Sequence, residues 1–201
     1  MEGTRRQTTP VTVFRSLVYL FVLVAALWIA SARPWTLLAQ PSSAPWAAPD
    51  FTHGDPEDWI NSRPLKLVDL EGRVVLLDFW TYGCWNCTRS LPWIKELETR
   101  FGDRGLVAIG VHTPEFKHEK NVFRVREQVA RLELDHPVMV DNDFSYWKAM
   151  NNRYWPTFYL IDKSGQVRDR AIGETHSGDA NATRIEARIE ALLAETVRDK
   201  L

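Results

Sequence analysis

A chain of 201 residues, with 45% hydrophobic residues, 10 glycines and 11 prolines, has enough apolar material for one globular domain plus accessory segments. The formal net charge is −1, and it is −4 beyond residue 33, where 21 basic side chains face 25 acidic ones. This balance excludes the strongly basic surface that is typical of nucleic-acid-binding proteins, so we expect no nucleic-acid partner.

An uncharged apolar run of 16 residues, 17–32, comes after three arginines, Arg5, Arg6 and Arg15. Basic residues on the N-terminal side of such a run favour a cytoplasmic N-terminus and export of the residues on its C-terminal side. We therefore predict a cytoplasmic segment over 1–16 and a single transmembrane anchor over 17–38, with the rest of the chain on the periplasmic, extracytoplasmic side of the cell membrane. Ala30-Ser31-Ala32 has the form of a signal-peptidase site, so a cleaved signal segment is the alternative.

Residues 39–60 repeat Pro, Ala and Ser without a period, which predicts a linker, with a docked portion around Phe51 and Trp59-Ile60. The folded domain is expected over 61–201. Its first element is predicted to be a β-hairpin, because Leu65–Leu70 alternates and Glu71-Gly72 then turns into a strand over 73–79.

The only two cysteines of the chain, Cys84 and Cys87, come after that strand at C-x-x-C spacing. No second cysteine pair completes a zinc site, so we expect no metal, and the strand-turn-helix context favours a redox pair. A helix N-terminus lowers a thiol pKa, which makes Cys84 the predicted nucleophile. Cys87, one helical turn further in, is the predicted resolving cysteine.

The remaining chain alternates between helical and strand patterns. Apolar residues at helical spacing end at Gly102, and a continuous apolar strand is expected over 106–111. Beyond it we expect a helix around 122–132, a strand over 136–141, a short helix over 144–150, a hairpin over 158–172 and a final helix over 185–197. This order predicts an α/β fold with a mixed sheet and helices on both faces.

Several separated motifs resemble the thioredoxin superfamily. They are Asp78-Phe79-Trp80 six residues ahead of the first cysteine, Pro92 in the helix after the cysteines, and Trp155-Pro156-Thr157 at the start of a strand. Residues 110–116 and the long insertion before the third strand resemble its exported TlpA/DipZ-like redoxin branch. The resemblance implies a thioredoxin-like three-layer α/β/α sandwich, a redox-active Cys84–Cys87 disulfide, and a cis peptide bond at Pro156 beside it.

The same resemblance suggests roles for further residues. Asp78 matches the buried acid that moves the proton of the resolving thiol, and its alternative is a carboxylate bonded to nearby N–H groups. Glu115 matches an acidic residue near the active site, and its alternative is an exposed loop glutamate. Pro156 would present backbone groups to an incoming peptide. Trp85 and Trp155 would form an apolar surface for substrate, unless they are ordinary rim or core residues.

These observations predict an exported, membrane-anchored thiol-disulfide oxidoreductase that acts on protein disulfides as a reductase, without a bound cofactor. Reductive work in an oxidising compartment requires a membrane electron donor. One alternative is a redoxin-type thiol peroxidase, although a resolving cysteine three residues away favours disulfide exchange. Another is a metal-binding module, although Met139, Met150 and the histidines offer no companion ligands near the two cysteines in the sequence.

Overall fold

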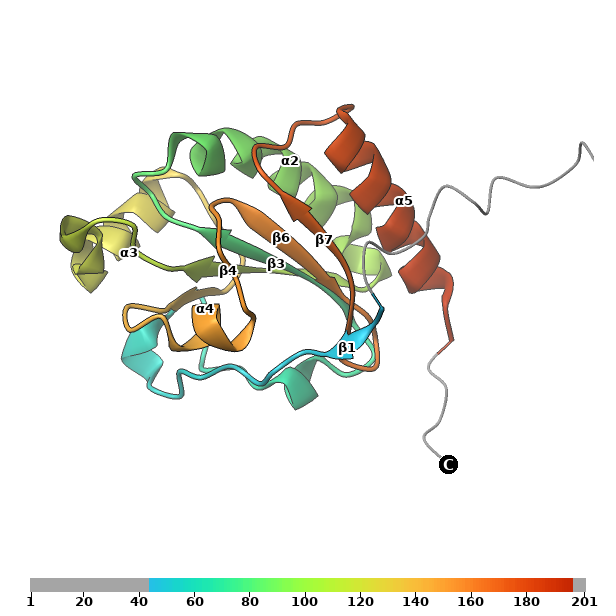
Figure 1. The fold of residues 1–201 in the computed structure, drawn as a ribbon, viewed down its shortest axis with the longest axis horizontal. Helices are drawn as coiled ribbons and strands as arrows, with labels where there is room; N and C mark the ends of the chain where they lie inside the picture. Colours follow the sequence, from blue (N-terminus) through green and yellow to red (C-terminus); the bar gives the residue numbers. More distant parts are fainter. Residues whose placement is uncertain (1–43, 197–201) are drawn as a thin grey trace, which may run out of the picture. The chain divides into compact units, whose positions relative to one another are not determined.

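The computed structural model describes residues 44–196, which form a seven-stranded mixed sheet with helices on both faces (Figure 1). The strands are β1 (Trp46–Ala47), β2 (Trp59–Ile60), β3 (Val74–Trp80), β4 (Leu106–His112), β5 (Val138–Val140), β6 (Thr157–Ile161) and β7 (Gln166–Ile172). The α-helices are α2 (Trp85–Phe101), α3 (Val122–Arg131), α4 (Ser145–Ala149) and α5 (Ala180–Ala194). Short 3-10 turns are η2 (Pro56–Asp58), η3 (Leu67–Leu70), η4 (Gly102–Arg104) and η5 (Lys117–Lys120).

Strand β3 lies at the centre of the sheet, whose order is β1-β7-β6-β3-β4-β5-β2. It pairs parallel with β4 and antiparallel with β6, while β4 and β5 are also parallel. All seven residues of β3 are buried, as expected for a strand covered on both faces. Its carboxyl end runs directly into the turn that precedes α2, and this places the cysteines at one end of the sheet.

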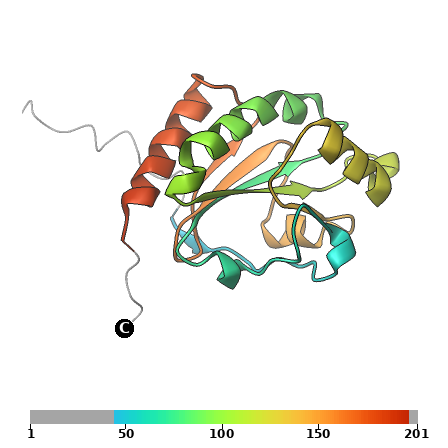
Figure 2. The same ribbon diagram turned by 180° about the vertical axis from the view of Figure 1, so that it is seen from behind.

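Alternation along β3 divides the core into two layers. Leu76 and Trp80 pack with apolar residues of α2, α3 and α5, whereas Leu77 and Phe79 pack on the opposite face with α4 and the segment before β3. Figures 1 and 2 show α2 and α5 together on one side of the sheet and α4 on the other. The predicted three-layer arrangement with a mixed sheet is confirmed.

The folded unit begins earlier than the predicted boundary at residue 61. Within the predicted linker, Trp46 pairs with Val167 and Trp59 pairs with Met139. This segment therefore supplies the edge strand on each side of the sheet, β1 and β2. Phe51 lies at ring-centroid distances of 5.4 Å from Trp59 and 5.2 Å from Tyr146. These aromatic contacts hold the segment against the sheet, although its composition is rich in proline.

The predicted β-hairpin over 65–79 is wrong, because Leu67–Leu70 forms the 3-10 turn η3 instead of a strand. The Asp69 carboxylate accepts from the backbone N–H of Lys66 at 2.9 Å, and Asp50 accepts from Leu67 at 2.6 Å. Side chains that bond the backbone locally compete with strand pairing. The hairpin of β6 and β7, by contrast, is confirmed.

Within residues 44–196, no helix combines the length and apolar character that crossing a membrane requires. The predicted anchor over 17–38 and the predicted cytoplasmic segment over 1–16 lie outside the described residues.

Candidate redox site

The cysteine pair sits at the N-terminus of α2. Cys84 is the N-cap residue, and its Sγ accepts from the backbone N–H of Cys87 at 3.2 Å. The two sulfurs form a disulfide. Cys84 is partly exposed and Cys87 is fully buried, so an incoming sulfur atom reaches Cys84 first. The unpaired N–H groups of the first turn stabilise a thiolate at the cap position, which favours Cys84 as the nucleophile.

Asp78 is the one acidic residue of β3. Its neighbours at alternate positions, Leu76 and Trp80, belong to the core layer that contains Cys87, so the carboxyl group is directed toward α2. The side chain is 3% exposed, and its Oδ1 has no hydrogen-bond partner. Burial raises the pKa of Asp78 to about 8. A carboxyl group with this pKa can accept and release a proton in the range where thiols ionise.

The peptide bond between Trp155 and Pro156 is cis, as the family resemblance implied. Thr157, the next residue, is opposite Phe79 in the β3–β6 ladder. Pro156 is therefore level with the end of β3 that leads to Cys84.

The two tryptophans predicted to contact substrate differ in their surroundings. Trp85 is 71% exposed on the first turn of α2. Trp155 is partly buried: its Nε1 donates to the carbonyl of Thr113 at 3.0 Å, and its ring lies 4.1 Å from that of Trp147. Trp155 is thus a fixed part of the site wall, whereas Trp85 is free to meet a partner.

Of the acidic residues in the loop after β4, Glu119 is the one that contacts the active-site turn. Glu115 is exposed, and only its backbone N–H takes part, donating to Glu119 Oε2 at 2.7 Å. Glu119 is fully buried, and it also accepts from the N–H of Phe116 at 2.9 Å and of Gly83 at 3.0 Å. Sequence reasoning missed Glu119, and its signal was only a second glutamate four residues further along.

His112 is a second buried group that the sequence analysis did not single out. It ends β4 opposite Trp80, and its ring stacks on Tyr82 at 5.6 Å and meets Trp80 edge-on at 5.4 Å. Nε2 lies 3.2 Å from the Thr81 hydroxyl, while Nδ1 is buried without a partner. Burial lowers the pKa of His112 to about 4, so the imidazole is neutral at pH 7.

A histidine–aspartate cluster, His53 with Asp141 and Asp143, has its ligand-type atoms within 4.8 Å of one another. Its geometry is that of an ion pair: His53 Nε2 is 3.1 Å from Asp141, and Nδ1 is 3.2 Å from Asp58. The bond to Asp141 is the main cause that raises the pKa of His53 to about 9. These contacts fasten the segment before β3 to the end of β5.

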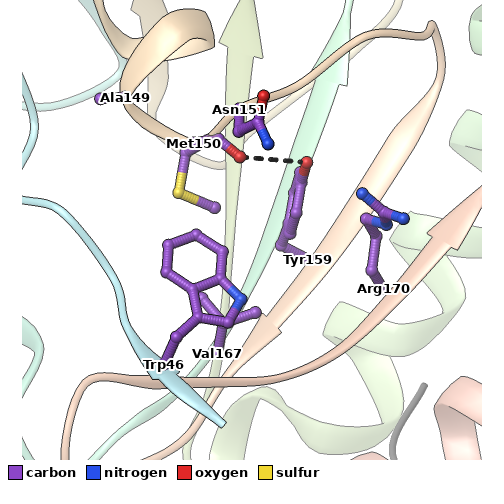
Figure 3. Close-up of a pocket in the computed structure, with 7 residues that line it drawn as sticks. All are labelled: Trp46, Ala149, Met150, Asn151, Tyr159, Val167 and Arg170. Carbon is purple, nitrogen blue, oxygen red and sulfur yellow. Dashed lines mark hydrogen bonds between the residues drawn. The ribbon is translucent and has the colours of Figure 1, made fainter. Parts of the chain in front are cut away.

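Figure 3 shows the side chains around a cavity whose volume is about 440 Å³. It is lined by Trp46, Ala149, Met150, Asn151, Tyr159, Val167 and Arg170. Tyr159 and Val167 belong to the core layer on the opposite face of the sheet from Cys87. The Tyr159 hydroxyl donates to the carbonyl of Met150 at 3.5 Å, the bond drawn in Figure 3. This cavity therefore has no part in the redox site.

The comparisons with known proteins agree with this geometry. The sequence model of the AhpC/TSA family matches residues 46–170. Protein DipZ of Mycobacterium tuberculosis (strain CDC 1551 / Oshkosh) is 43% identical over 128 residues, which is 62% of this chain and only 18% of that protein. Thiol-disulfide oxidoreductase YkuV of Bacillus subtilis (strain 168) is 27% identical over 69% of this chain and 89% of that protein. A crystal structure of a putative thiol:disulfide interchange protein DsbE from Chlorobium tepidum is 25% identical, with a TM-score of 0.62, over 73% of this chain and 95% of that one.

Proposed function

We propose, from the premise that this chain belongs to the AhpC/TSA family, that it reduces disulfide bonds in exported proteins. The chain is a thioredoxin-like thiol-disulfide oxidoreductase of the TlpA/DipZ-like branch. The observation that supports the proposal best is the difference in exposure between a reachable Cys84 and a fully buried Cys87 at one helix N-terminus.

The reaction is a consequence of that asymmetry. The Cys84 thiolate attacks one sulfur of a substrate disulfide, forms a mixed disulfide, and releases the other substrate sulfur as a thiolate. Asp78 in its ionised form, a minor fraction at pH 7, then takes the proton of Cys87, whose thiolate attacks Cys84 Sγ and releases the second substrate sulfur as a thiolate. The helix holds Cys87 at high effective concentration, so this second step outruns external thiols. The Cys84–Cys87 disulfide of the structure is the oxidised product.

Substrate binding is assigned to the surface around Cys84. Trp85 offers an exposed apolar face next to the nucleophile, and Trp155 with Pro156 forms the adjoining wall. Backbone groups beside Pro156 are available to an extended peptide, which brings a substrate disulfide to Cys84.

The proposed function includes a membrane anchor and a membrane-bound electron donor. A helix over 17–38 would hold the domain at the outer face of the membrane, and the apolar run behind three arginines supports it. In an oxidising compartment, the oxidised pair returns to the dithiol only if a membrane donor supplies two electrons. Periplasmic fractionation with protease protection tests the location, since a cytoplasmic domain would stay protected.

Insulin and hydrogen peroxide in parallel test the reaction. The reduced protein should cleave insulin disulfides and lose its two thiols as it does so, because Cys87 resolves the mixed disulfide. A thiol peroxidase would instead oxidise Cys84 to a sulfenic acid with peroxide, and this is the second candidate that the family match raises. Rapid turnover of peroxide without insulin cleavage would replace the proposal by that alternative.

A further inference from the structure

Glu119 joins two segments that are 36 residues apart, the turn before Cys84 and the loop after β4. A Cβ atom on Gly83 would stand 2.1 Å from Glu119 Oε1, so the carboxylate fills the space that a larger residue would need. A second bond joins the same segments, from the Tyr82 hydroxyl to the carbonyl of His118 at 3.1 Å. The turn that delivers the nucleophile is therefore fastened at two consecutive residues.

The carboxylate of Glu119 places a negative charge beside the nucleophile. All three of its hydrogen-bond partners are backbone N–H donors, and the form of a carboxyl group that only accepts is the ionised one. Burial and the nearby Glu119 carboxylate raise the pKa of Tyr82, while Arg124 acts to lower it.

The other buried titratable groups around the turn are neutral at pH 7. Burial holds Asp78 mostly protonated, and burial keeps His112 uncharged. Glu119 is fully buried, so its charge is poorly screened by solvent. It also occupies the Gly83 N–H, which is then not available to the Cys84 sulfur.

We propose that Glu119 is a positioning residue that fixes the turn before Cys84 and, by its buried charge, limits the stability of the Cys84 thiolate. The inference rests on the proposed redox role of the pair. Reduction of the disulfide takes up two electrons and one proton to give a Cys84 thiolate and a Cys87 thiol, with a dithiol reductant as the electron source. A less stable thiolate makes this uptake less favourable, so Glu119 keeps the couple reducing.

The test compares two variants of Glu119. In Glu119→Gln the charge is lost and the size is kept, so the pKa of the Cys84 thiol should fall by on the order of one pH unit. The equilibrium with dithiothreitol should move several-fold toward the reduced protein. Glu119→Asp keeps the charge, but its side chain is too short by one methylene to bond Gly83 in the same way. Its stability should fall, while its Cys84 pKa should stay near that of the wild type.

Alkylation rates of Cys84 against pH and redox-buffer titration are the two readouts, and Glu119→Asp separates an effect of the charge from an effect of the position of the turn. Asp162→Asn is the matched control, because Asp162 is also buried and also accepts from two backbone N–H groups, of Ser164 and Gln166, at the other end of β6. It should lose stability without any change in the Cys84 pKa.

An unchanged Cys84 pKa in folded Glu119→Gln, or an equal fall in Glu119→Asp, would overturn the inference. If Glu119→Gln does not fold, Gly83→Ala decides, since its methyl group displaces the carboxylate: a lower Cys84 pKa supports the charge effect, and an unchanged one refutes it. Insulin cleavage by the wild-type protein is measured alongside. Its absence would overturn the proposed function itself, whereas normal cleavage with an unchanged pKa would overturn only the role of Glu119.

Discussion

Replacing Asp78 by asparagine should stabilise the oxidised protein at neutral and alkaline pH. The pKa of Asp78 is raised by burial from 3.8 to about 8, so the folded state retains a proton that the unfolded state gives up. The free energy of unfolding of the wild type therefore falls as the pH rises from about 4, and it levels off above about 8. At pH 7 the accumulated cost is on the order of 4 kcal/mol.

Asparagine removes this pH dependence because it does not titrate. The unbonded Oδ1 is a cost common to both side chains, so it cancels in the comparison. Urea unfolding at pH 5, 7 and 8.5 should show the wild type losing on the order of 2 to 3 kcal/mol between pH 5 and 7 relative to Asp78→Asn. Parallel pH profiles of the two proteins would refute the raised pKa.

Asp162→Asn should change the free energy of unfolding in the opposite direction. Burial acts to raise the pKa of Asp162, but hydrogen bonds from Arg168 and from backbone N–H groups outweigh it and hold the pKa below its usual range. Its contribution to stability is present above the unfolded pKa and is lost as the pH falls, so Asp162→Asn should destabilise the protein at pH 7.

In single-turnover kinetics, Asp78→Asn should also slow the resolution of mixed disulfides by Cys87. Unchanged kinetics would remove Asp78 from the mechanism.

Three further predictions concern side chains around and beyond the pair. Oxidation should change tryptophan emission, because Trp80 and Trp85 are close in sequence to the sulfurs, and identical spectra of both redox forms would contradict this. Trp85→Ala should weaken the reduction of insulin but not of a small disulfide, with stability within about 0.5 kcal/mol of the wild type, since the ring is 71% exposed; equal losses on both substrates would count against a docking role. His53→Gln should lower stability below pH 6.5 by on the order of 1 kcal/mol, because the raised His53 pKa makes the ion pair with Asp141 stabilising there. That difference should disappear as the pH rises through about 9, and its persistence at higher pH would show that the charge is not its source.

Local patterns in the sequence were sufficient for the centre of the fold. The continuous apolar run of β3 and the helical spacing of α2 each report burial directly, and together they fix where Cys84 and Cys87 lie. The mixed sheet was also predictable. β4 and β5 have the pattern of buried parallel strands separated by a helix, and β6 and β7 have the pattern of an antiparallel hairpin.

Contacts between distant segments could not be predicted in the same way. The alternation before β3 looks like a strand, and only the bonds that Asp50 and Asp69 make to the backbone turn it into η3. In the sequence alone, no local pattern distinguishes Glu115 from Glu119, since both lie in the loop after β4. Which of them is buried depends on Gly83, a residue far away in sequence whose missing side chain leaves room for the carboxylate.

Trapping of mixed disulfides tests whether Cys84 is the attacking cysteine and Cys87 the resolving one. Cys87→Ser and Cys84→Ser variants of the full chain would be compared on non-reducing gels of membrane fractions. We expect covalent partners on Cys87→Ser, because the partly exposed Cys84 still attacks and no second cysteine resolves the product. We expect almost none on Cys84→Ser, whose remaining sulfur is fully buried. Equal trapping by the two variants, or more on Cys84→Ser, would contradict this assignment.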